Sequence, residues 1–140
     1  DRAAYHELVV ASMVNASRYY LDPDVRDVLT SPEIEELPLR TTAAMALAWG
    51  RVRLFHALGQ SERALAELQR IVHAPLGDPD DAPANASEAH LMSARILWEA
   101  GRAEEARAHA RAFVEASPSP DLAEQIVLRH LPDLRPLTTR

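Results

Sequence analysis

One short segment occurs twice in this chain, first at residues 56–64 and again at residues 98–106. The copies read HALGQSERA and WEAGRAEEA, so they share glycine, glutamate and alanine at the same offsets, 42 residues apart. Self-similarity at a fixed period of this length is typical of stacked helical hairpins, in which each hairpin buries its apolar face against its neighbour. The duplication therefore predicts an all-α repeat protein. The abundance of alanine and an aromatic content of only 5% favour the same closely packed helices.

The sequence around the first copy predicts two helices joined by a tight turn. One of two adjacent threonines, Thr41 or Thr42, can cap the first helix, and Gly59 is expected to end it in the left-handed conformation. Ser61 is expected to cap the second helix, which carries apolar residues at three- and four-residue steps. Together these helices form a predicted repeat 1 over residues 41–74.

The second copy lies in a predicted repeat 2 over residues 87–118. Its first helix is expected to start at Ser87 and to break at Gly101, and its second helix is expected over residues 103–116. Between the repeats, residues 75–86 carry three prolines, one glycine and three aspartates, a composition that predicts an exposed loop. This loop accounts for a repeat spacing longer than usual.

The two ends of the chain are also expected to be helical. Residues 1–38 predict a long helix up to Leu21 and two short helices near Val25 and after Ser31. A helix over residues 120–131 is expected to cap repeat 2, because an uncapped hairpin would expose its apolar face. Its inner side is predicted to carry Leu122, Ile126, Val127 and Leu131. Residues 1–140 are thus predicted to form one domain of stacked antiparallel helical hairpins.

The repeat resembles the tetratricopeptide family, whose helix pairs carry a glycine at the turn and a small alanine early in the second helix. The match is most specific in the second half of repeat 2, at Gly101, Ala106, Phe113 and Pro118, and Gly59 and Ala64 occupy the corresponding places in repeat 1. The resemblance covers roughly residues 41–120 and implies a right-handed α-solenoid. The first helix of each pair departs from the family pattern, since repeat 1 has Arg51 where the family prefers leucine.

The resemblance also implies a binding surface, because the first helix of each tetratricopeptide pair lines a concave groove. Carried onto this sequence, the register places six residues in that groove: Trp49, Arg53, His56, Leu91, Arg95 and Trp98. Arginine and tryptophan side chains would suit an acidic peptide or a chain terminus. The alternative interpretation is that both tryptophans fill the seam between hairpins and that the arginines pair with acids such as Glu88 and Glu99.

Composition and motifs argue against several classes of function. The chain has 21 acidic residues against 15 basic ones, a net charge of -6, and so lacks the basic surface that nucleic-acid binding requires. It has no cysteine, no His-Glu-x-x-His pair, no Gly-x-Ser-x-Gly elbow and no glycine-rich phosphate loop. No apolar run approaches the ~20 residues that cross a bilayer. We therefore expect a soluble domain, cytoplasmic or periplasmic, with no enzymatic activity, no metal, no cofactor and no membrane insertion.

These observations predict a non-catalytic protein-interaction or scaffold module that binds a partner segment, acidic in character, in a helical groove. Two alternatives stay open at this stage. One is homo-oligomerisation through the long N-terminal helix, whose exposed face is expected to carry Val10, Tyr19 and Tyr20. The other is a regulatory or sensor domain that binds a small ligand between its helices and belongs to a larger protein, which a membrane span outside this segment could anchor.

Overall fold

The computed structural model describes residues 22–74 and 81–132, which contain seven α-helices and no β-strand. The predicted all-α class is confirmed for this part of the chain. The chain divides into two compact units, Asp1–Pro79 (unit 1) and Asp80–Arg140 (unit 2), and each is described by itself. The division falls inside the predicted loop over residues 75–86. That both units form one domain, and that their hairpins stack as a solenoid, stay predictions.

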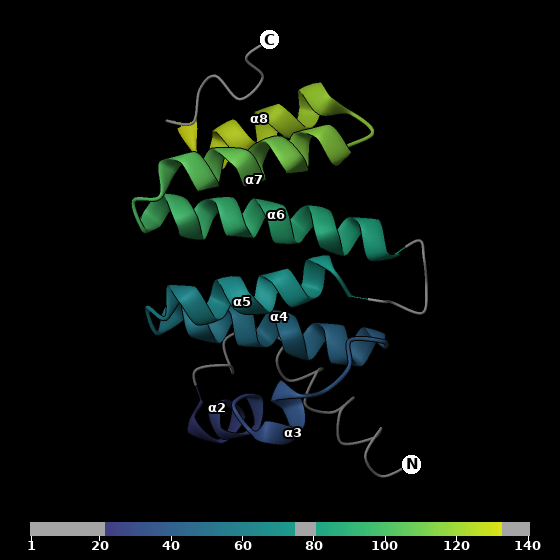
Figure 1. The fold of residues 1–140 in the computed structure, drawn as a ribbon, viewed down its shortest axis with the longest axis vertical. Coiled ribbons are helices and arrows are strands. Elements are labelled where there is room, and N and C mark those ends of the chain that lie inside the picture. Colours follow the sequence, from purple (N-terminus) through teal and green to yellow (C-terminus); the bar gives the residue numbers. More distant parts are fainter. Residues whose placement is uncertain (1–21, 75–80, 133–140) are drawn as a thin grey trace. The chain divides into compact units, whose positions relative to one another are not determined.

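Unit 1 contains four described helices, shown in Figure 1: α2 (Pro23–Leu29), α3 (Pro32–Glu35), α4 (Thr42–Ala57) and α5 (Ser61–Val72). Polar caps set two of their starts. The side chain of Asp22 accepts a hydrogen bond from the Asp24 amide at 2.9 Å, and the Thr41 hydroxyl accepts one from the Ala44 amide at 3.0 Å. Of the two threonines that the sequence offers as caps, Thr41 is therefore the one that caps α4.

Two serines do not cap the helices that follow them. The Ser31 hydroxyl donates to the carbonyl of Val28 at 2.7 Å, and no side chain caps α3. Ser61 is the first residue of α5, and Gln60 occupies the cap position without a side-chain hydrogen bond. The predicted Ser61 cap is wrong, because the preceding turn returns the chain to helix one residue earlier than the pattern suggests.

Both repeat glycines adopt the left-handed conformation that the sequence predicts, with φ of +73° at Gly59 and +78° at Gly101. In each turn the glycine amide bonds to the carbonyl three residues earlier, and the next amide bonds to the carbonyl five residues earlier, at 2.8 and 2.9 Å. This pair of bonds is the Schellman motif, which satisfies the last carbonyls of a helix. The repeated glycine thus has the same structural role in both hairpins.

Replacing Gly59 with alanine is expected to lower the free energy of unfolding by about 1–2 kcal/mol, the strain of a left-handed L-residue. An added Cβ would meet nothing within 4 Å, so no steric clash contributes. Urea denaturation followed by circular dichroism measures the loss. The Gly59→Asn variant should lose less, because asparagine tolerates the left-handed region. Equal losses in both variants would contradict this account of the turn.

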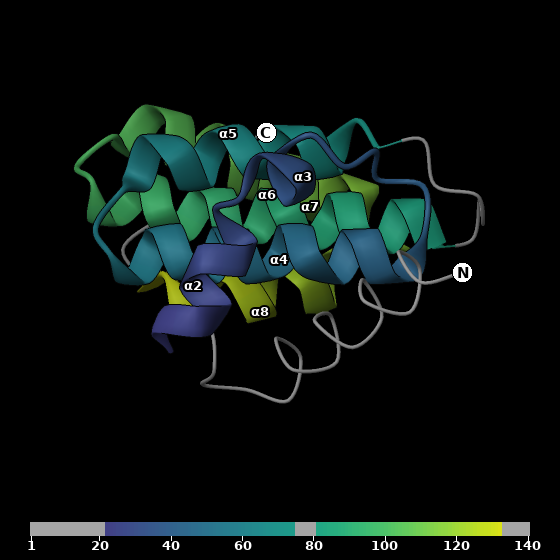
Figure 2. The same ribbon diagram turned by 90° about the horizontal axis from the view of Figure 1, so that it is seen from below.

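Helix α4 is buried on two sides. It packs against α5, and the short α2 lies across it (Figure 2). The core between α4 and the two short helices consists of Val25, Leu29, Ile34, Ala46, Leu47 and Leu54. On the other side of α4 the apolar residues Met45, Ala48, Val52 and Phe55 are buried, whereas Trp49 is only half-buried. A single amphipathic stripe therefore describes only half of the surface that α4 buries.

Unit 2 contains α6 (Asp81–Glu99), α7 (Ala103–Ala116) and α8 (Pro120–His130). Helix α6 packs against α7, and α7 packs against α8. The predicted start at Ser87 is wrong, and so is the loop prediction for residues 81–86, because α6 begins at Asp81. Pro83 falls in the first turn, where amides have no helical acceptor, so a proline there does not interrupt the hydrogen-bond ladder.

The predicted C-terminal capping helix is present as α8, and it begins at Pro120. Its buried stripe consists of Ala123, Val127 and Leu131, spaced four residues apart. Leu122, which the sequence places on the inner side, is instead 55% exposed because it lies one residue away from that stripe. The inner-side prediction is therefore wrong for Leu122.

The alanines of the repeat are fully buried, with 0% exposure at both Ala64 and Ala106. Each lies early in the second helix of its hairpin, where a small side chain lets two helices approach closely. The predicted close packing within each hairpin is confirmed. The predicted helix over residues 2–21, with Val10, Tyr19 and Tyr20, lies outside the described residues.

Candidate functional site

The six residues predicted for the groove are divided between the two units. Helix α4 of unit 1 carries Trp49, Arg53 and His56, and helix α6 of unit 2 carries Leu91, Arg95 and Trp98. Both arginines are exposed, and the other four side chains are half-buried. Each unit thus presents its own three residues on one helix, and a shared groove stays a prediction.

Arg95 makes the pairing that the alternative interpretation anticipates. Its Nε lies 3.1 Å from Oε1 of Glu99, one helical turn away. Because the two side chains are 54% and 48% exposed, water screens this ion pair and its contribution to stability is small. Arg95 therefore has an acidic neighbour of its own within α6.

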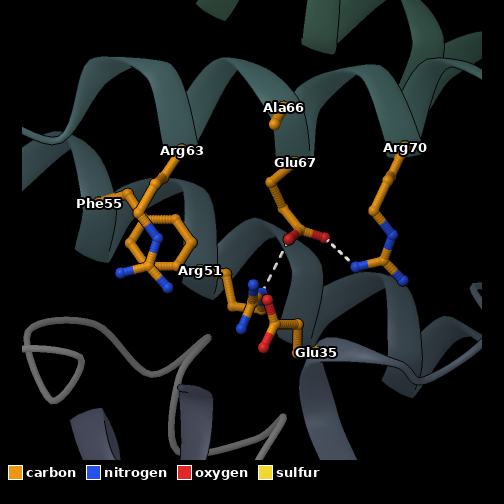
Figure 3. A pocket seen from close by; sticks show the side chains of 7 residues that line it. All are labelled: Glu35, Arg51, Phe55, Arg63, Ala66, Glu67 and Arg70. Atoms are coloured by element: carbon orange, nitrogen blue, oxygen red, sulfur yellow. Dashed lines mark hydrogen bonds and ion pairs between the residues drawn. The ribbon is translucent and has the colours of Figure 1, made fainter. Parts of the chain in front are cut away.

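The sequence does not predict a polar cavity of about 200 Å³ that lies beside α4 and α5 (Figure 3). We call it the arginine pocket. It is lined by Glu35, Arg51, Phe55, Arg63, Ala66, Glu67 and Arg70. Three guanidinium groups against two carboxylates give its lining a formal charge of +1, in a chain whose net charge is -6.

Glu67 is the centre of a buried charge network in this pocket. Its carboxylate, in a residue only 3% exposed, accepts a hydrogen bond from Nε of Arg51 at 2.8 Å and another from Nη1 of Arg70. Arg51 also donates to the carbonyl of Leu29, and Arg70 donates to that of Leu37 at 2.8 Å. The network therefore joins the α4–α5 hairpin to the backbone around α2 and α3.

Arg63 differs from the other two arginines of the pocket. Its side chain is exposed, its guanidinium carbon lies 4.2 Å from the centre of the Phe55 ring, and its Nη1 donates to Oε1 of Gln60 at 3.0 Å. Among the residues that the structure describes, no carboxylate lies within 4.0 Å of it. Arg63 is thus a positioned cation whose charge has no direct counter-ion in the described part of unit 1.

A second cavity, of about 340 Å³, shares Arg63 and Phe55 with the arginine pocket. Its remaining lining residues come from α2 and from the α4–α5 turn: Pro23, Arg26, Asp27, Thr30, Leu58 and Gln60. The stacked pair of Arg63 and Phe55 therefore contributes to the lining of both cavities.

The sequence does carry a signal for the buried pair. Glu67 falls on the predicted apolar face of α5, between Ala64 and Leu68, and Arg51 falls among the apolar residues of α4. Charged residues at such positions are almost never buried unless they are paired. Two opposite charges on the facing sides of one predicted hairpin are therefore the pattern that could have identified this network.

Unit 2 contains a different pair of titratable groups, one on each helix of its hairpin. The Nδ1 atoms of His90 on α6 and His109 on α7 lie 3.0 Å apart, and the ring centres are 5.2 Å apart. At this distance one Nδ1 donates a hydrogen bond and the other accepts it. Only one of the two Nδ1 atoms can therefore carry a proton. Burial lowers the pKa of His109, and the charge of His90 lowers it further, although Glu105 acts in the opposite direction.

The stability of unit 2 is therefore expected to decrease as the pH falls below the ordinary histidine value of 6.5. Because the pKa of His109 is lower in the folded state, the unfolded chain takes up the proton first, which favours unfolding until the pH reaches the folded pKa. Urea unfolding at pH 7.5 and at pH values below 6.5 measures this loss. His109→Gln should reduce the pH dependence, and the exposed-site control His73→Gln should not. An unchanged pH dependence in His109→Gln would contradict the prediction.

Within residues 22–74 and 81–132, no group of three or more His, Asp or Glu side chains is arranged to hold a metal ion. Over the same residues, every helix is too short or too polar to cross a membrane.

Comparison with known proteins adds no relative. No protein-family model matches the sequence, and no curated protein or solved structure matches it significantly. The class of the protein therefore follows from its own helices: an all-α protein whose two units are each built around one helical hairpin.

Proposed function

We propose that this chain is a non-catalytic protein-interaction module that binds a segment of a partner protein. The observation that carries the proposal is the exposed guanidinium of Arg63, stacked on Phe55 and shared by two cavities. Arginine on an aromatic ring is a frequent centre of protein recognition, because it combines a planar set of donors with a large contact area. Its direction is fixed before a partner arrives, which reduces the entropy lost on binding.

The sizes of the two cavities support a polypeptide partner. At about 200 and 340 Å³ each has room for a side chain, and they meet at one residue pair, so consecutive side chains of one extended segment can occupy both. The predicted surface residues Trp49 and Arg53 add half-buried aromatic and exposed cationic groups on the same helix as Phe55. Unit 1 thus offers the side-chain types of a recognition surface on one hairpin.

Selection of a displayed random-peptide library on the full chain tests this function. We expect peptides that bind the wild type with micromolar affinity and bind Arg63→Gln at least about tenfold more weakly, since about 1.4 kcal/mol corresponds to tenfold. Replacement of Arg129, an exposed arginine of α8, by glutamine is the matched control and should bind like the wild type. Failure to enrich any peptide, or equal binding by Arg63→Gln, would overturn the proposal.

A further inference from the structure

We infer that the arginine pocket binds one carboxylate, held by the guanidinium of Arg63. The inference rests on the proposed function, which it deepens by naming the group that is recognised. Carboxylate oxygens match the planar fork of a guanidinium, and charge-assisted bonds of this kind are roughly twice as strong as neutral hydrogen bonds. The source of the carboxylate is an acidic side chain or the free C-terminus of the bound segment.

The positive charge of the pocket is fixed in place. Arg51 and Arg70 share the single carboxylate of Glu67, so these three side chains together keep a formal charge of +1. Both arginines also donate to backbone carbonyls, which prevents them from turning away. Arg63 adds a second positive charge without a carboxylate of its own among the described residues. An anion that enters the pocket therefore meets a net excess of one positive charge, after the carboxylate of Glu35 is counted.

The start of α5 adds to this field. Helix α5 begins at Ser61, and no side chain caps it, so the positive end of its dipole lies two residues from Arg63. The partial positive charge of this helix end favours an anion near Arg63, whereas the carboxylate of Glu62 in the same turn opposes it. The helix end alone would not define a site, but here it acts on the same position as a stacked, positioned arginine.

Two residues line the arginine pocket but not the second cavity, and they can therefore show which cavity the carboxylate occupies. Ala66 lines the arginine pocket but not the second cavity, and its small, exposed side chain lies between Arg63 and Arg70 on α5 (Figure 3). Glu35 also lines only the arginine pocket, and its exposed carboxylate opposes the entry of another anion. A larger residue at 66 should therefore block binding, and a neutral residue at 35 should strengthen it.

The experiment uses two pairs of small probes on the full chain. N-acetylglutamate amide and N-acetylglutamine amide differ only in the side-chain carboxylate, whereas N-acetylglycylglycine and its amide differ only in the terminal carboxylate. NMR titration of the Arg63 Nε–H signal gives the dissociation constants. We expect at least one acid to bind about fivefold or more tightly than its amide, which corresponds to about 1 kcal/mol. The pair that shows the difference identifies the source of the carboxylate.

Three variants of exposed residues complete the test, since each should leave the fold intact. Ala66→Leu should weaken binding of the preferred acid about tenfold, and Glu35→Gln should strengthen it about two- to threefold. Arg63→Gln, followed through the signals of neighbouring backbone amides, should abolish it. Equal binding of acids and amides, or undiminished binding by Ala66→Leu, would overturn the inference. Peptides from the library that bind through Arg63 without any carboxylate would retain the proposed function and reject only this inference.

Discussion

Replacing Glu67 with glutamine is expected to lower the free energy of unfolding by about 3–5 kcal/mol, because it leaves buried positive charge without compensation. Arg51 is only 4% exposed, and its Nε loses the only carboxylate that it contacts among the described residues. Arg70 loses the same partner, but its side chain is 36% exposed and is partly hydrated. Urea denaturation at pH 7 measures the loss.

Two further variants separate the charge effect from simple loss of a hydrogen bond. Replacing Arg51 and Glu67 together with methionine and leucine removes both buried charges, and most of the lost stability should return. Glu99→Gln breaks the exposed pair with Arg95 and should change stability by no more than about 1 kcal/mol. If Glu67→Gln were as mild as Glu99→Gln, the buried network could not have the role described for it.

Replacing Phe55 with alanine is expected to cost about 3–5 kcal/mol of stability, the usual loss for removing a buried ring. Phe55 has 0% exposure, and its ring lies under Arg63 at 4.2 Å and near Arg51 at 5.0 Å. The change therefore opens a cavity in the core and also removes the surface on which Arg63 is positioned. Thermal and urea unfolding report the first effect, and loss of peptide binding at a temperature where the variant stays folded reports the second.

Leu58→Ala is the matched control for this second prediction. Leu58 also lines a cavity beside Arg63, but it is 37% exposed at the C-terminal end of α4, where the hairpin turn begins. Its truncation should change stability by about 0.5 kcal/mol or less, as is usual at the surface. If Phe55→Ala were as stable as Leu58→Ala, the Phe55 ring would not support the core beneath Arg63 as described.

The sequence predicts the hairpins well because their turns depend on local chemistry. Gly59 and Gly101 occupy left-handed positions that few other residues tolerate, and Thr41 caps α4 through a bond to its own first turn. The start of α6 could not be predicted in the same way. A proline such as Pro83 normally indicates the end of a helix, and the sequence does not show that this proline lies in a first turn, where it is tolerated. Apolar character alone predicts that Leu122 lies on the inner side of α8, but the small Ala123 is the residue that is buried there.

The candidate site was harder to predict than the fold. The predicted groove residues follow from family resemblance, and they belong to two different units. The arginine pocket depends instead on tertiary contacts, since Arg51 and Glu67 are 16 residues apart and meet only when the hairpin closes. Stacking of Arg63 on Phe55 likewise needs both helices in place. Periodicity marks the stripe on which such residues lie but does not show which charges pair across it.

The most direct test of the central claim is hydrogen–deuterium exchange of the full chain with and without a library-selected peptide. If a partner segment binds at Arg63 and Phe55, α5 and the C-terminal half of α4 should exchange more slowly in the complex, while α7 should be unaffected. Protection confined to α6 and α7, or no protection by a peptide that binds, would contradict recognition at the arginine pocket.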